Sequence, residues 1–195
     1  MTVIASYFIP NIPHVISSQT GEQGSGKSNN SRKIKSLVDP SRVTLISSPK
    51  DLEHAQMIGE KHWLISFDNI SRIPEWLSDY YCRGVTGEGD MKRSLYTNDD
   101  EFIRSYRRCF VLNGIGSSMY RPDLLDRSII FEIPILKSTR PESIMNEEWQ
   151  KYLPGILGGF FTAVSKAMGL VAQINGHEKF RMSDFAQWGG ALSET

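Results

Sequence analysis

One eight-residue segment, Gly21-Glu22-Gln23-Gly24-Ser25-Gly26-Lys27-Ser28, constrains the fold more than any other feature of this sequence. It satisfies the pattern G-x-x-x-x-G-K-[ST] in full. The glycines let successive backbone N–H groups point at a phosphate, and the positive end of the following helix adds to the attraction. A β-branched run (15–18) precedes the segment and a helical pattern (27–37) follows it. The sequence therefore predicts a strand, a phosphate-binding loop and a helix.

The loop predicts ATP and Mg²⁺ as ligands. Lys27 is expected to bridge the β- and γ-phosphates, and the Ser28 hydroxyl is expected to ligate Mg²⁺. All eight residues of the segment are candidates for nucleotide binding. The alternative is a flexible Gly/Ser turn that ends in Lys-Ser, and the strand and helix patterns on either side argue against it.

A second candidate site residue ends an apolar run, Trp63 to Phe67. Nucleotide hydrolysis on such a loop needs a carboxylate at a strand's carboxyl end to hold Mg²⁺ through water, and Asp68 fits that role. The alternative is a polar Asp-Asn turn. Asn69 stands where many such ATPases have a glutamate, and an amide orients water but accepts no proton from it. Either another carboxylate such as Glu75 is the base, or the phosphate accepts the proton, or turnover is slow.

Asn113 ends another apolar run, Cys109 to Leu112. Its amide is expected to hydrogen-bond the γ-phosphate or the attacking water. Taken alone, Asn-Gly is a common turn dipeptide, but its position after the other two motifs favours a sensor role.

Arg127 comes directly before the final apolar run, 128–133. An arginine there is expected to reach the γ-phosphate of a neighbouring subunit, which accelerates turnover by about 10³- to 10⁵-fold in known cases. The alternative is an exposed turn in which Arg127 pairs with Asp123 or Asp126. Arg121 is the second candidate for the same role.

Apolar runs that alternate with amphipathic stretches predict an α/β fold. We expect a five-stranded, mainly parallel sheet flanked by helices, with strands near 15–18, 43–46, 63–67, 109–112 and 128–133. Glycine and charge between Thr86 and Asp100 predict a loop or hairpin. Residues 145–171 predict helix in one or two pieces, broken near Pro154. We therefore divide the chain into a core, 1–137, and a small C-terminal helical cap, 138–195.

Composition excludes several classes of protein. Twenty-two basic and 22 acidic residues give a net charge of zero, which argues against binding nucleic acid by bulk charge. The cysteines and the four histidines show no zinc-binding spacing. The uncharged runs 1–21 and 152–165 contain prolines, and the second is too short to cross a bilayer. We therefore expect an intracellular, cytoplasmic protein without a membrane segment.

Together these motifs resemble the AAA+ ATPase branch that contains superfamily 3 helicases, and more closely the ATPase domain of phage, plasmid and prophage primase–helicases. The resemblance covers nearly the whole chain and rests on segments 21–28, 64–69, 77–97, 112–115, 121–127 and 181–186. It implies a P-loop NTPase fold of AAA+ type and a homo-hexamer or other ring. Such a ring hydrolyses ATP between subunits and translocates on single-stranded or forked DNA.

The resemblance also assigns three basic residues. In superfamily 3 members a loop carries a basic residue into the central channel, and here Lys92 and Arg93 hold that position. The alternative is a solvated turn whose charges balance Glu88 and Asp90. Arg181 stands where related proteins place a second sensor arginine near the phosphates.

No primase or polymerase domain precedes the loop, so a partner domain or a longer parent protein is expected to supply priming. The leading hypothesis is an ATP-driven DNA motor of mobile-element replication. The second is a switch in which ATP binding drives assembly with slow or no repeated turnover. The third is a small-molecule kinase, which lacks a use for Asn113 and Arg127.

Overall fold

The computed structural model describes residues 1–87, 90–93, 101–104, 107–114 and 121–195, with the backbone alone for 90–93 and 101–104. A five-stranded sheet forms the centre of this described part, in the order β2-β3-β6-β1-β7. Every pairing in it is parallel. The strands are β1 (Ile16–Thr20), β2 (Ile46–Ser47), β3 (Leu64–Ile70), β6 (Cys109–Gly114) and β7 (Ser128–Glu132). The predicted α/β fold is therefore confirmed.

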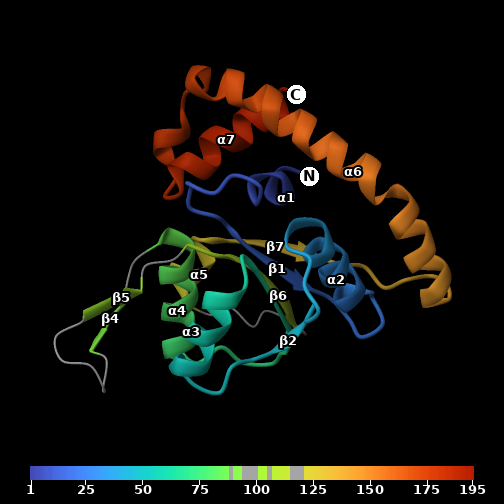
Figure 1. Cartoon of the computed structure of the whole chain (residues 1–195), viewed down its shortest axis with the longest axis horizontal. Coiled ribbons are helices and arrows are strands. Elements are labelled where there is room, and N and C mark those ends of the chain that lie inside the picture. Colours follow the sequence, from blue (N-terminus) through green and yellow to red (C-terminus); the bar gives the residue numbers. More distant parts are fainter. Residues whose placement is uncertain (88–89, 94–100, 105–106, 115–120) are drawn as a thin grey trace.

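Helices cover both faces of the sheet (Figure 1). One face carries α3 (Leu52–Lys61), α4 (Glu75–Thr86) and the short α5 (Pro122–Leu125), and α2 (Lys27–Val38) lies on the other. Because β3 and β6 are covered on both faces, they read as continuous apolar runs, and Leu64, Ile65 and Phe110 are fully buried. All the strands run in the same direction, so their carboxyl ends meet at one edge of the sheet.

The hairpin expected between Thr86 and Asp100 is present in part. Strands β4 (Asp90–Arg93) and β5 (Glu101–Arg104) pair antiparallel and extend away from the main sheet (Figure 1). Lys92 and Arg93 lie in β4, and their side chains are outside the described part of the chain.

The helical region draws on both ends of the chain. Helix α6 (Glu142–Leu170) is followed by two short 3-10 turns, Val171–Gln173 and His177–Lys179, and by α7 (Ser183–Ser193). The N-terminal helix α1 (Thr2–Ser6), which the sequence did not predict, lies beneath α6 and α7 (Figure 1). An apolar cluster that includes Ala5, Leu37 and Phe160 joins α1, α2 and α6.

The predicted break near Pro154 is wrong, because α6 continues through it. Proline removes one helical hydrogen bond, which leaves the carbonyl four residues earlier, at Gln150, without its partner. Both Pro154 and Gln150 are exposed, so water can bind that carbonyl. The packed residues on either side then hold the helix together.

The uninterrupted helix also changes the assessment of membrane segments. Within the described residues, the stretch 142–173 is long and apolar enough to cross a membrane by length and composition alone. Core helices of soluble proteins meet the same criterion, and one face of α6 packs against the apolar cluster with Phe160. Only 11% of its most apolar window is buried, so most of its surface faces outward.

Candidate functional site

The phosphate-binding segment forms a tight loop between β1 and α2. Gly26 is the N-cap of α2 and has a φ of 84°, a left-handed conformation that favours glycine. At Gly21, whose φ is 146°, a Cβ atom would clash with the carbonyl oxygen of Ile133, the residue directly after β7. The first turn of α2 directs its backbone N–H groups toward this loop. The geometry is that of an anion-binding cradle.

Lys27 lies inside the loop and is only 8% exposed. Its ammonium group donates to the carbonyl oxygens of Gly21, at 2.9 Å, and Glu22, at 2.7 Å, and to the Ser25 hydroxyl, at 3.1 Å. The loop's own oxygens therefore hold the positive charge at the place where a phosphate would be bound.

Three polar side chains from separate elements converge beside the loop. The Ser28 hydroxyl, in the first turn of α2, donates to Asp68 Oδ1 at 3.0 Å. The Asn113 amide donates to the Ser28 hydroxyl at 3.1 Å and also to Asp68 Oδ1. Because β3 and β6 are parallel neighbours, Asp68 and Asn113 reach the same edge of the sheet. The structure thus brings together three residues that the sequence singled out separately.

The donor set of this cluster suits Mg²⁺. A carboxylate and a hydroxyl are hard oxygen ligands, and Mg²⁺ is commonly held by one or two such protein groups together with phosphates and water. The described residues contain no group of three or more His, Cys, Asp or Glu side chains able to hold a metal ion. Any metal here would therefore rely on few protein ligands, as Ser28 and Asp68 provide.

Asn69 adopts an unusual backbone conformation next to Asp68. Its φ is 56°, and among the described non-glycine residues it alone has a positive φ. The register of β3 against β6 also shifts between Phe67 and Ile70, which marks a bulge at this point. Asn tolerates the left-handed region better than most residues. Regular pairing of β3 with β6 therefore stops at Phe67, directly before Asp68, and resumes at Ile70.

Glu75, which the sequence offered as an alternative base, lies at the start of α4. Its carboxylate is 3.3 Å from the guanidinium of Arg121, which also pairs with Asp79 at 2.9 Å. The Glu75 side chain is 82% exposed. Its described ion-pair partner is thus an arginine outside the Ser28, Asp68 and Asn113 cluster.

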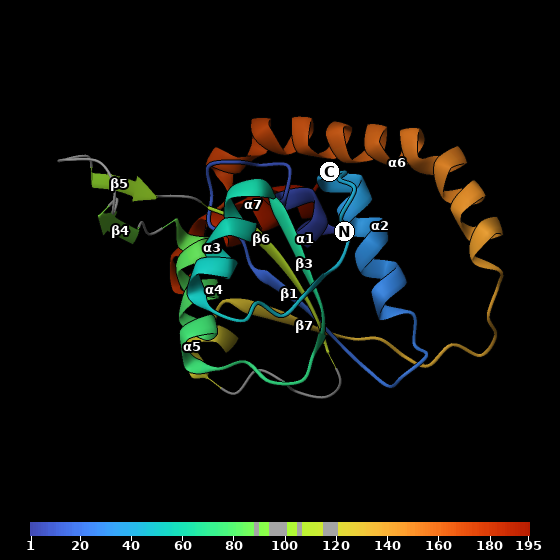
Figure 2. The same ribbon diagram turned by 60° about the horizontal axis from the view of Figure 1, so that its bottom comes forward.

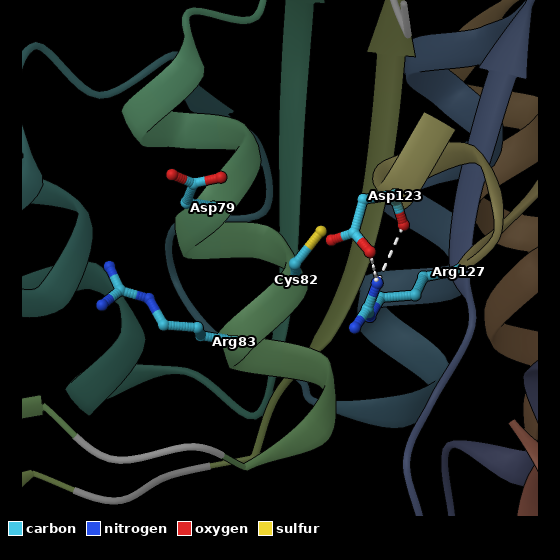
Figure 3. Close-up of a pocket in the computed structure, with 5 residues that line it drawn as sticks. All are labelled: Asp79, Cys82, Arg83, Asp123 and Arg127. Atoms are coloured by element: carbon cyan, nitrogen blue, oxygen red, sulfur yellow. Dashed lines mark hydrogen bonds and ion pairs between the residues drawn. The ribbon is translucent and has the colours of Figure 1, made fainter. Parts of the chain in front are cut away.

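Arg127 directly precedes β7, so it lies at the amino edge of the sheet, away from the cluster of Ser28, Asp68 and Asn113. Its guanidinium donates to the carboxylate of Asp123, at 2.5 Å, and to that residue's carbonyl oxygen, at 3.0 Å. Figure 3 shows both bonds, together with Cys82 of α4, beside a cavity of about 280 Å³. The hydrogen bond from Arg127 holds the pKa of Asp123 below its usual range. The Arg127 side chain is 11% exposed, whereas that of Arg121 is 41% exposed.

Arg181 is not brought to the phosphate-binding loop, which corrects the expectation drawn from the resemblance. Its guanidinium pairs with Asp123 at 2.6 Å and with Asp126 at 3.4 Å. Both acids precede β7, so they belong to the amino edge of the parallel sheet, opposite the loop. The residue instead joins the last helical segment to α5.

The sequence also missed a groove between α2 and α6 that contains Trp149. The only signals were an aromatic residue in a helical pattern and a lysine on the loop helix, and both are typical of ordinary packing. The groove depends on how α6 folds back across α2, which no local pattern encodes.

The parallel sheet, the loop after β1 and the polar carboxyl edge define the fold as α/β of the P-loop NTPase type. The sequence profile of the actinomycete integrative conjugative element replication proteins matches residues 1–194, so the chain belongs to that family. It is thus a replication protein of a mobile element. No curated protein matches the chain.

Two solved structures align with this chain over part of their own length. The C-terminal region of NrS-1, in an apo form, aligns with a TM-score of 0.52 and 16% identity, over 81% of this chain and 39% of that one. The JCV helicase aligns with a TM-score of 0.43 and 11% identity, over 99% of this chain and 59% of that one. The chain therefore spans less than two thirds of either. The NrS-1 likeness supports the fold alone.

Proposed function

We propose that this protein binds ATP and Mg²⁺ on the Gly21–Ser28 loop, hydrolyses ATP as an oligomer, and uses the energy to move on or remodel DNA during replication of the mobile element. The observation that carries the proposal is the convergence of Ser28, Asp68 and Asn113 beside a loop that already encloses Lys27. Replication of the element takes place inside the cell, so we place the protein there.

In this proposal each residue has a separate task. Lys27 exchanges the loop carbonyls for phosphate oxygens, which are better partners for an ammonium group. Ser28 and Asp68 hold Mg²⁺, which when bound neutralises charge on the β- and γ-phosphates. Asn113 orients the γ-phosphate or a water by hydrogen bonding. Asn69 stands beside them and can orient a water, but it cannot accept its proton.

The proposed assembly is a ring of the AAA+ branch, a hexamer or another ring, because the motif order resembles superfamily 3 helicases. Single-stranded or forked DNA is the proposed substrate, contacted through Lys92 and Arg93 of the β4–β5 hairpin. A primase or polymerase is the proposed partner. A second candidate function is an ATP-dependent assembly switch, which the amide at Asn69 and the pairing of Glu75 with Arg121 favour.

The test is the ATPase rate measured against protein concentration, with and without single-stranded DNA. A motor should show a rate per subunit that rises with concentration and rises again with DNA. Lys27→Met, which removes the ammonium and keeps the chain's bulk, should lower turnover by about 10²- to 10³-fold. ATP-driven assembly without repeated turnover would support the switch instead. Wild-type protein that binds no nucleotide would rule out both functions.

The arginine that serves a neighbouring subunit is tested by comparing two variants. The Arg127 side chain is mostly buried and must leave its pair with Asp123 to reach outward, whereas the more exposed Arg121 must leave only two exposed acids, a pairing worth little. We therefore propose Arg121, in place of Arg127, as the arginine that reaches the γ-phosphate of a neighbouring subunit. Arg121→Ala should then abolish oligomer-dependent turnover, keep nucleotide binding and leave the thermal midpoint nearly unchanged. Arg127→Ala should lower the free energy of unfolding by about 1–2 kcal/mol. If only Arg127→Ala abolishes turnover, at full stability, the role returns to Arg127.

A further inference from the structure

A groove of about 360 Å³ lies between α2 and the first half of α6. Its walls are mainly apolar and aromatic, with Trp149 and Tyr152 from α6, and Lys33 projects into it from α2. Figure 2 shows the two helices side by side, with the segment that follows β7 leading up to the start of α6. Its size and apolar lining suit a small molecule with a flat, hydrophobic ring.

Trp149 is held in a defined position within this groove. Its indole N–H donates to the Ser36 hydroxyl of α2 at 3.0 Å. The Lys33 ammonium lies over the face of the indole ring, 5.3 Å from its centre, and donates to Asn146 at 2.5 Å, so a ring that stacks on this face takes the place of the ammonium. A ring fixed in this way loses little conformational freedom when a second flat ring stacks on it.

The groove and the phosphate-binding loop both lie against α2. Lys27 and Lys33 lie on the same helix, about 9 Å apart along its axis at the usual rise per residue. The side chain of Leu136, in the segment between β7 and α6, lies 3.3 Å from where a Cβ atom on Gly26 would be. Leu136 and its neighbour Ile135 are exposed, at 51% and 60%. Leu136, an exposed apolar side chain, therefore lies beside the loop on the segment that leads to Arg140 at the groove.

The charges at the rim favour a neutral ring over a polyanion. Arg140 forms a two-pronged pair with Glu148, at 3.0 and 2.6 Å, so its charge is already balanced. Glu142, in the first turn of the same helix, is near enough to act electrostatically on Lys33 and adds a second carboxylate to that of Glu148. A phosphate backbone would approach these carboxylates unfavourably, whereas a purine would not.

We propose that this groove receives the base and ribose of the nucleotide whose phosphates bind at Gly21–Ser28, and that Trp149 is the ring on which the base stacks. The inference rests on the proposed function and adds its nucleoside subsite. It also gives α6 a direct contact with the nucleotide.

The test separates the base from the phosphates by comparing two ligands. The dissociation constants of Mg·ATP and of Mg·tripolyphosphate are measured by calorimetry on the full chain. Trp149→Ala should weaken ATP binding by about tenfold, in line with the loss of one base–aromatic stack, and should leave tripolyphosphate binding within about twofold. Trp149→Phe, which keeps a ring, should recover most of the ATP affinity.

A second variant guards against simple loss of folding. Met145→Trp fills the groove instead of emptying it, and should give the same selective loss of ATP binding. Equal losses for both ligands, or unchanged ATP binding in both variants, would overturn the subsite while leaving the phosphate site intact. Wild-type protein that binds neither ligand would overturn the proposed function itself. If Trp149→Ala weakens binding of an oligo-dT strand and not of ATP, the groove is a DNA site and the proposal is wrong.

Discussion

The two edges of the central sheet carry polar clusters of opposite character. At the carboxyl edge, the described partners of the Asp68 carboxylate are a hydroxyl and an amide, Ser28 and Asn113, with no cation. At the amino edge, the buried Lys35 ammonium bonds Asp39 at 2.7 Å, the Leu64 carbonyl at 2.7 Å and His62 at 3.1 Å. Helix α2 joins the two edges, because Ser28 lies near its start and Lys35 near its end.

The amino-edge cluster is saturated with partners. Asp39 accepts hydrogen bonds from Lys35 and from the backbone N–H groups of Trp63 and Leu64. Burial alone would raise the pKa of Asp39, but these hydrogen bonds outweigh it and hold the pKa below its usual value. The difference teaches that the Asp39 charge at the amino edge is balanced within the protein, whereas the described partners of Asp68 at the carboxyl edge are neutral groups, as the proposed Mg²⁺ site requires.

The largest expected effect comes from Asp68→Asn at the carboxyl edge. The amide keeps the shape and a hydrogen-bonding oxygen but removes the charge that would hold Mg²⁺. ATP turnover should fall by about 10²- to 10³-fold, a loss typical of removing one charge-stabilising group. Urea unfolding should change little, because no cation within the described ranges of the chain pairs with this carboxylate. A large loss of stability in Asp68→Asn would erase the contrast between the two edges.

The next effect in size comes from Lys35→Met at the amino edge. Removing one partner of a buried ion pair leaves the other uncompensated, so the free energy of unfolding should fall by about 3 kcal/mol. Adding Asp39→Asn should recover part of that loss, and the affinity of folded protein for nucleotide should stay unchanged. Denaturant titration of the single and double variants measures the loss of stability and its partial recovery. Equal nucleotide affinity in all variants is the control, and a selective loss of affinity would contradict the division of roles.

A smaller effect on the free energy of unfolding, which varies with pH, is expected from His14, also at the amino edge. It is fully buried between Tyr7 and Trp63, and neither ring nitrogen has a hydrogen-bond partner in the described part of the chain. Burial, helped by the positive charge of Arg107, lowers the pKa of His14 from 6.5 to about 4. The unfolded chain therefore takes up the proton first as the pH falls.

Stability should decrease by about 1.4 kcal/mol per pH unit as the pH falls from 6.5 toward 4, and this contribution should be constant above that window. Urea midpoints measured at several pH values report the slope. His14→Phe should flatten it over the same range. The same slope in wild type and variant would show that another group is responsible.

Much of the fold could be predicted because its signals are local. The loop pattern fixed the position of the strand–loop–helix unit, and the apolar runs that end in Asp68 and Asn113 indicated two neighbouring strand ends. The first strand was placed one residue early, and β2 covers Ile46–Ser47 instead of 43–46. Such boundaries depend on pairing with β3, which the sequence does not specify.

The remainder depends on contacts between distant segments. Pro154 predicted a break because the sequence does not show that Gln150 is exposed to water. Arg181 was expected at the phosphates, whereas its position beside Asp123 follows from how α7 packs. Trp149 resembled an ordinary core residue, since its place above α2 is set by the course of α6.

The close approach of Gly21 to the Ile133 carbonyl has a consequence for how motion spreads through the molecule. The Ile133 N–H also bonds the Thr20 carbonyl at 2.8 Å, so backbone atoms alone fasten the end of β7 to the beginning of the loop. A shift of the loop is thus transmitted to the segment leading into α6 without any particular side chain. A linkage made of main chain requires glycine at 21 and any residue other than proline at 133, and it places no other demand on the side chains that flank it.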